Sequence, residues 1–136
     1  MSTRTDYFIQ AVLDHVYLNQ AIANIGDASG LQPSAADGNL YVALLQAGGE
    51  ADYTSYARQA ISRTDGFSRS NNVISNAAQI NFPKATGGSN TITKVAIYDQ
   101  VSGGNKLHEQ TLADSIPVST NIQPIIEAGE LDITGS

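Results

Sequence analysis

Near the start of the chain, apolar residues recur with the spacing of an α-helix. The residues that fall on one helical face are Ile9, Val12, Leu13, Val16 and Tyr17. Thr3 or Thr5 can cap the first turn, Asp6 suits the positive end of the helix dipole, and Gly26 is a natural stop. The pattern predicts one N-terminal amphipathic helix over residues 5–25.

From Asn39 onward the apolar spacing changes to a period of two residues. The stretch NLYVALLQ, residues 39–46, is apolar on both alternations, as expected of a strand covered on both faces. Shorter strand-like runs follow at spacings of about 8–12 residues, with turn signals between them. These runs are 56–63, 71–75, 78–82, 91–99, 105–113, 116–119, 122–127 and 130–134. The pattern predicts a mainly β protein, an antiparallel β-sandwich or barrel preceded by the helix.

The two patterns are separated by a polar connection. Residues 26–38, GDASGLQPSAADG, have the Gly, Pro, Ser and Asp content of a loop. We therefore expect one structural domain with two parts. Residues 1–38 form the N-terminal helix and connecting loop, and residues 39–136 form the β-sandwich or barrel.

Composition and charge exclude several classes of binding partner. Seven Lys and Arg against 13 Asp and Glu give a formal charge of −6, which lacks the positive surplus that binds nucleic acid. No run approaches the roughly 18 apolar residues of a membrane helix, and the first residues do not read as a signal peptide. We expect no nucleic-acid partner, no membrane, and folding in a cytoplasm. The absence of cysteine excludes disulfides and thiolate chemistry.

Two glycine pairs raise the question of a phosphate-binding loop. Such a loop needs a helix after it, but Gly87–Gly88 is followed by the β-branched run TITKVAIYD. Gly103–Gly104 likewise lies between two strand-like runs. We expect both pairs to turn the chain.

The residue types of catalysis and metal binding do not form a recognisable set. His15 and His108 have no Asp, Glu or His at metal-ligand spacing, and His108 is expected to face solvent with Lys106 and Gln110. There is no G-x-S-x-G sequence, and the carboxylates are scattered. We expect no enzyme, no catalytic residue, no bound metal and no cofactor.

The candidate interaction residues fall into two groups. Arg58, Arg63 and Arg69 form the local excess of positive charge, which indicates either a solvated strand edge or a patch that docks on an acidic protein. The second group is the helix and loop surface, because a small sheet has limited room to cover it. Its residues are Tyr7, Phe8, Val12, Val16 and Leu31. We expect part of it to be buried against another subunit, with on the order of 800 Å² per partner.

The order of several segments resembles a family of small phage virion proteins, described as tail-fibre-like or head-decoration proteins. The segments are AVLDHVYLNQA, LYVALLQA, YARQAIS, INFPKATGGSNTITKVAIYDQVSGGNKL and IEAGELDIT, and together they cover most of the chain. Residues 26–38 look longer than the family pattern, and AGGEADYTS looks shorter.

The resemblance implies a non-enzymatic β-rich protein located in the virion. Its first implied function is capsid decoration, as a cement protein that attaches to the head shell at symmetry axes and stabilises it. The alternative is a tail or fibre-associated protein. The implied partners are the major capsid protein or a tail protein, together with further copies of the chain, as a homo-oligomer that could be a trimer. A third hypothesis, outside the class of virion structural proteins, is a carbohydrate-binding module, for which Tyr53 and Tyr56 are the candidate aromatic residues.

Overall fold

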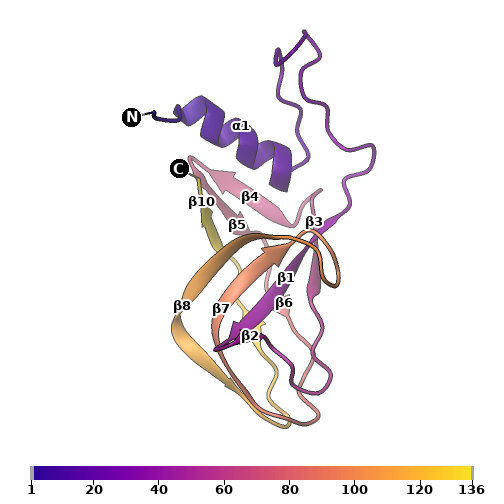
Figure 1. Cartoon of the computed structure of the whole chain (residues 1–136), viewed down its shortest axis with the longest axis vertical. Coiled ribbons are helices and arrows are strands. Elements are labelled where there is room, and N and C mark those ends of the chain that lie inside the picture. Colours follow the sequence, from indigo (N-terminus) through magenta and orange to yellow (C-terminus); the bar gives the residue numbers. More distant parts are fainter. Residues whose placement is uncertain (1, 136) are drawn as a thin grey trace.

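The computed structural model describes residues 2–135. These residues form a mainly β, antiparallel structure with one N-terminal helix, and no sheet within them closes into a barrel (Figure 1). The predicted fold class is therefore confirmed. The elements are α1 (Asp6–Tyr17), β1 (Asn39–Gln46), β2 (Gly49–Glu50), β3 (Gln59–Ser62), β4 (Phe67–Ser70), β5 (Val73–Asn76), β6 (Ile80–Asn81), β7 (Asn90–Tyr98), β8 (Lys106–Val118), β9 (Ile125–Ile126) and β10 (Asp132–Thr134).

The largest sheet is built around β1 and β7. β1 pairs with β7 along one side and with β3 and β2 along the other, and β8 pairs with the far side of β7. Val42, Ala43 and Leu44 are fully buried on β1, so both alternations of this strand are covered, as its continuous apolar run predicts.

Two smaller sheets share a core with the first. One has the order β10–β5–β4, and the other pairs β6 with β9. The helix adds Ile9, Leu13 and Tyr17 to the same hydrophobic cluster, and the ring of Tyr17 meets that of Phe67 edge-on at 5.3 Å between centroids. The inner face of α1 is therefore part of the core of the β-domain.

The helix is shorter than the predicted span of residues 5–25. It begins after Thr5, whose side chain accepts a hydrogen bond from the Phe8 amide, and it ends at Tyr17. Asn19 follows with a left-handed backbone (φ 54°), which no helix continues through. Ile22, predicted to lie within the helix, instead bridges Leu31 across the loop.

Each predicted run overlaps a strand of the structure, but several strands are shorter than predicted: β3 spans Gln59–Ser62 of the run 56–63, and β9 spans Ile125–Ile126 of the run 122–127. The runs 105–113 and 116–119 join into the single strand β8, because an irregularity opposite Thr93 accommodates residues 112–115. The apolar pattern predicts neither β2 nor β4. β4 has the sequence FSRS, in which Phe67 is the one apolar residue, so it carries no alternation for a pattern to detect.

Candidate interaction surface

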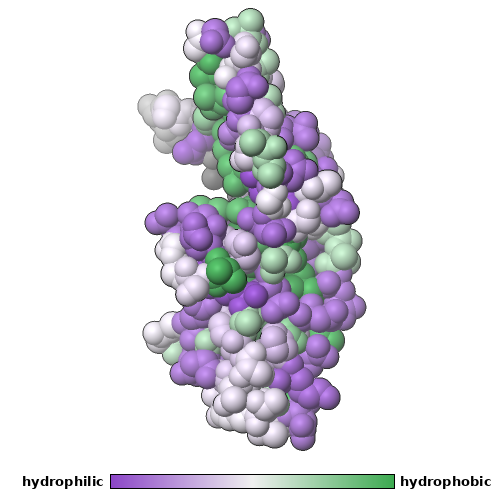
Figure 2. All heavy atoms as spheres, turned by 90° about the vertical axis from the view of Figure 1, so that its right-hand side faces the viewer, coloured by the Kyte–Doolittle hydropathy of each residue, from purple (hydrophilic) through white to green (hydrophobic). Residues whose placement is uncertain are grey.

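Exposed hydrophobic side chains gather in the N-terminal part of the molecule. In the part of the chain that the structure describes, five of the eight exposed large hydrophobic residues lie within the first 31 positions. They are Tyr7 (67% exposed), Phe8 (44%), Val12 (37%), Ile25 (47%) and Leu31 (43%). We call this set the N-terminal apolar surface. Figure 2, viewed from the side of the loop that follows the helix, shows hydrophobic residues along the projecting upper part of the molecule.

The helix exposes these residues because of its period. At 100° per residue, Tyr7, Phe8 and Val12 fall away from the face formed by Ile9, Leu13 and Tyr17. Val16 lies between the two faces, half-buried against the core. Of the four helical residues predicted to form an interface, three are thus exposed and one is a boundary residue.

The carboxylates of α1 are directed to the β-domain and away from the N-terminal apolar surface. Asp6 Oδ1 accepts a hydrogen bond from Asn72 Nδ2 at 3.1 Å, and Asp14 Oδ1 accepts one from Arg69 Nε at 2.5 Å. Both partners lie on or beside β4 and β5. The outward face of the helix is therefore apolar without an adjacent negative charge from these two residues.

Arg63 fixes the loop that follows the helix. Its Nε and Nη2 donate to the carbonyls of Val16 and His15, each at 2.8 Å, which satisfies groups that a helix end leaves unpaired. Nη2 also donates to Asn19 Oδ1, and Nη1 donates to Ser34 Oγ and the Asp37 carbonyl, all at 3.1 Å. The guanidinium of Arg63, the residue after β3, thus binds the end of the helix and both ends of the loop.

Asn19 and Asp37 extend this arrangement. Asn19 is buried, and its side chain exchanges hydrogen bonds with the Ser34 backbone and donates to Asp37 Oδ1 at 2.8 Å. Hydrogen bonds from Thr64 and Asn19 lower the pKa of Asp37 below its usual value, so its carboxylate stays charged. The loop 18–38 is therefore held in place although it contains no regular element.

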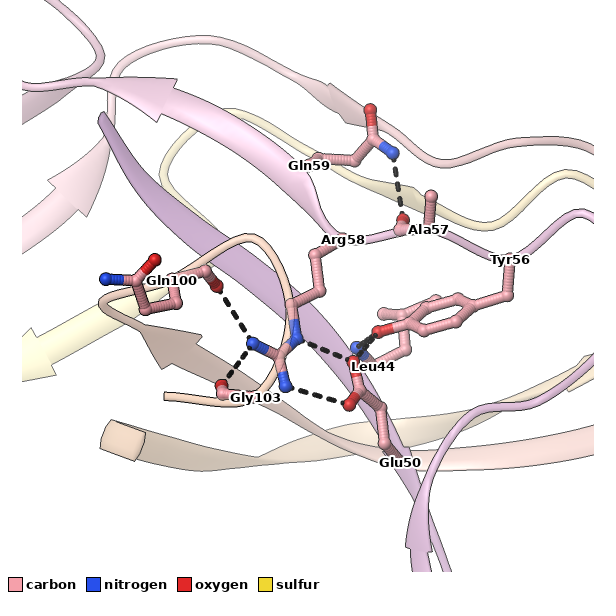
Figure 3. Close-up of polar contacts among 8 residues, drawn as sticks. All are labelled: Leu44, Glu50, Tyr56, Ala57, Arg58, Gln59, Gln100 and Gly103. Atoms are coloured by element: carbon pink, nitrogen blue, oxygen red, sulfur yellow. Dashed lines mark hydrogen bonds and ion pairs between the residues drawn. The ribbon is translucent and has the colours of Figure 1, made fainter. Parts of the chain in front are cut away.

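Arg58 lies in a different cluster, at the β7–β8 hairpin (Figure 3). Its Nε and Nη2 donate to both carboxylate oxygens of Glu50, at 2.8 and 3.0 Å, and Nη1 donates to the carbonyls of Gln100 and Gly103. The guanidinium carbon also lies 3.7 Å from the ring centre of Tyr98. The Arg58 side chain is 6% exposed, so this residue closes the hairpin onto the sheet.

Tyr56 completes the same cluster. Its hydroxyl donates to Glu50 Oε2 at 2.6 Å and accepts from the Leu44 amide at 3.2 Å. Arg58 lowers the pKa of Glu50, and burial raises the pKa of Tyr56. Tyr53 is 2% exposed, with its hydroxyl on the Pro83 carbonyl. Tyr53 and Tyr56 therefore do not form an exposed stacking platform for sugars.

The structure separates the three predicted arginines. Arg63 and Arg69 bind residues of α1, whereas Arg58 binds the β7–β8 hairpin. Each has acceptors within the chain, which no charge pattern in the sequence reveals. Docking of these arginines on an acidic partner stays a prediction.

The two glycine pairs differ in whether the strands on either side of them pair with each other. Gly103 and Gly104, with φ of 62° and 72°, turn the chain between the paired strands β7 and β8, as predicted. Gly87 and Gly88 lie in a loop between β6 and β7, which do not pair, and Gly87 bridges Thr54. A strand follows this pair, so it does not have the geometry of a phosphate loop.

His108 differs from its prediction. The extra residue Leu107 shifts the register, so that His108 pairs with Ile97 and is half-buried instead of facing solvent. This burial lowers the pKa of His108 below its ordinary value.

Within residues 2–135, no group of three or more His, Cys, Asp or Glu side chains is arranged to hold a metal ion. Across the same residues, α1 included, the structure has no helix with the length and apolar content needed to cross a membrane.

Comparison with known proteins gives a family. A family model described as podophage GP4 fiber I protein gp80 matches residues 4–134, which include α1 and every strand. No curated protein sequence matches the chain.

Proposed function

The chain belongs to the podophage GP4 fiber I protein gp80 family, and we propose that it attaches to a phage particle, as a fibre component, through the N-terminal apolar surface. A fibre-family protein is a structural component of the virion. This agrees with the resemblance to small phage virion proteins and favours its tail or fibre alternative. Capsid decoration is the less supported proposal, because the family name refers to a fibre.

The observation that supports this attachment surface is the exposure of Tyr7, Phe8 and Val12 on a helix whose opposite face is fixed in the core. Large exposed apolar side chains on one surface are typical of protein interfaces. Arg63 and Arg69 already hold the helix and loop in one arrangement. Binding would therefore order few additional groups, which lowers its entropic cost.

The proposed function also implies binding partners. A tail protein or a further copy of the chain would cover the N-terminal apolar surface, and a homo-oligomer such as a trimer would present several copies of it. The major capsid protein is the partner in the capsid decoration alternative. We also propose that the protein acts by assembly and has no catalytic activity.

Electron microscopy of particles from the phage that encodes this chain tests the location. A tag added after Ser136 and labelled with gold should place the protein on fibres at the tail. Label confined to the head shell would instead support capsid decoration. Particles that carry no label, although the tagged protein is made and folded, would contradict a virion function.

A further inference from the structure

A surface groove of about 410 Å³ lies between the middle of β8 and the segment that includes β9. Its apolar lining includes Leu112, Ile116 and Ile125, which are half-buried and therefore still present part of their surface to the opening. Its charged lining consists of the carboxylates of Asp114, Glu127 and Glu130, all at exposed positions. The groove thus combines apolar surface with negative charge.

These three carboxylates have no cation beside them within the chain. The four ion pairs among residues 2–135 all involve other acids. Glu130 Oε1 accepts a hydrogen bond from the Glu127 amide at 3.1 Å, but the carboxylates of Asp114 and Glu127 have no hydrogen-bond partner in the described part of the chain. Three negative charges around one opening repel one another, so the groove favours a partner that carries positive charge.

Hydrogen bonds hold the two sides of the groove together. Gln110 Nε2, on β8, donates to the Glu130 carbonyl at 3.1 Å, and Gln110 Oε1 accepts from the Asp132 amide at 2.8 Å. Asn76 Nδ2, on β5, donates to the Glu127 carbonyl at 2.9 Å. The groove is therefore formed before a partner binds, which lowers the entropic cost of binding.

The outward face of α1 has the complementary character. Tyr7, Phe8 and Val12 are exposed on this face, and the two carboxylates of the helix are directed to the β-domain. Arg4 and Phe8 line the same surface depression at the start of the helix. The N-terminal end of a helix also carries a partial positive charge. Apolar side chains and positive charge therefore lie together at this end of α1.

The helix face and the groove belong to different parts of the molecule. α1 packs against β4 and β5, whereas β8 forms one side of the β-domain (Figure 1). We propose that the helix face of one copy of the chain docks into the groove of the next copy, head to tail, a step that rests on the proposed attachment through the N-terminal apolar surface. Phe8 and Val12 then cover the aliphatic side chains of the groove, and Arg4 lies near its carboxylates. Because the contact joins two different surfaces, it repeats from copy to copy and forms a closed ring or a filament.

Sedimentation equilibrium of the purified full-length chain measures this contact without phage particles. We expect the wild type to self-associate at concentrations up to about 1 mM, where even weak contacts populate complexes. Phe8→Asp with Val12→Asp alters the helix face at exposed positions. Asp114→Lys with Glu127→Lys reverses charge at exposed positions of the groove. Each double variant should fold, as circular dichroism verifies, and should associate at least about tenfold more weakly. A monomeric wild type would overturn the proposal.

Mixing the two double variants distinguishes a head-to-tail contact from a symmetric one. The helix variant keeps an intact groove, and the groove variant keeps an intact helix face. Their mixture should therefore form a 1:1 complex that neither variant forms alone. If α1 instead packed against α1 of a second copy, the groove variant would still self-associate and the mixture would form no new complex. That result would contradict the proposal.

A charge reversal outside the groove provides the control. Asp65→Lys lies in the exposed turn between β3 and β4 and should leave association unchanged, whereas the single change Asp114→Lys should weaken it. Equal weakening by both would show that net charge controls association, and would contradict docking in the groove.

The solution measurement and the particle measurement fail independently. A chain that is monomeric in solution but present on particles would overturn the head-to-tail contact alone. A chain that self-associates but is absent from particles would support this contact and overturn the proposed virion function.

Discussion

At the scale of single residues, two arginines hold segments that are far apart in the sequence. Arg63 reaches the carbonyls of His15 and Val16, and Arg58 reaches those of Gln100 and Gly103. A planar guanidinium suits this role because its donors diverge in one plane toward several acceptors. The sequence shows an excess of positive charge around these residues, but it does not show that the acceptors lie within the chain.

Arg63→Ala should lower the free energy of unfolding by about 2–4 kcal/mol, because it removes a charged donor and leaves partly buried carbonyls without a partner. Arg63→Lys should recover less than half of the loss, since an ammonium cannot reach all five acceptors. Urea denaturation measures both. Lys84→Ala removes an exposed positive charge and should change stability by less than about 0.5 kcal/mol. A loss below about 1 kcal/mol for Arg63→Ala would contradict the assigned role.

Glu50 should make stability depend on pH. Arg58 lowers its pKa in the folded protein, so the unfolded chain binds this proton first as the pH falls. The stabilisation is therefore complete above the ordinary glutamate pKa and is lost as the pH falls through the lowered value. Urea denaturation between pH 7 and pH 3 should show a steeper decline for the wild type than for Glu50→Gln. Parallel curves for the two proteins would show that this pair makes no such contribution.

At the scale of elements, the sequence predicts the segments with strong apolar periodicity. It does not predict the segments whose position depends on contacts with residues far away in the sequence. β1 and β7 follow from runs of buried apolar residues. The end of α1 depends on the left-handed backbone of Asn19 and on Arg63, 44 positions later, and β4 depends on pairing with β5. Apolar spacing contains none of this information.

The sequence likewise predicts only part of the N-terminal apolar surface. Tyr7, Phe8, Val12 and Leu31 could be proposed because they exceed what a small sheet can cover, and each is exposed on the free chain. The sequence does not indicate that Ile25 belongs to this surface, because the predicted helix extends to this residue.

The β7–β8 hairpin offers a matched pair of glycines. Gly103 and Gly104 both have positive φ, but a Cβ on Gly104 would meet Asp99 Oδ1 and the Gln100 side chain, whereas one on Gly103 has open space. Gly103→Ala should lower the free energy of unfolding by about 1 kcal/mol from backbone strain alone. Gly104→Ala should cost at least about 1 kcal/mol more, because overlap adds to the strain. Thermal denaturation compares them, and equal losses would contradict the closer packing of Gly104.

At the scale of the whole molecule, α1 has one face in the core and the other exposed. Ile9, Leu13 and Tyr17 are buried in the hydrophobic cluster, so removing residues 1–30 would uncover the core as well as remove the proposed docking surface. Loss of attachment in such a truncated protein could not be assigned to docking. Substitutions on the exposed face separate the two roles.

Incorporation of a surface variant into phage particles tests attachment through the N-terminal apolar surface most directly. Phe8→Asp combined with Val12→Asp changes two exposed positions and leaves the core face of α1 intact. The matched control, Val101→Asp with Leu107→Asp, changes two exposed apolar residues at the β7–β8 hairpin. Quantitative mass spectrometry of purified particles counts the copies of each protein, and circular dichroism verifies folding. We expect the helix variant to fold but to be reduced at least tenfold in particles, while the control is incorporated like the wild type. Wild-type copy numbers of the helix variant would contradict attachment through the N-terminal apolar surface.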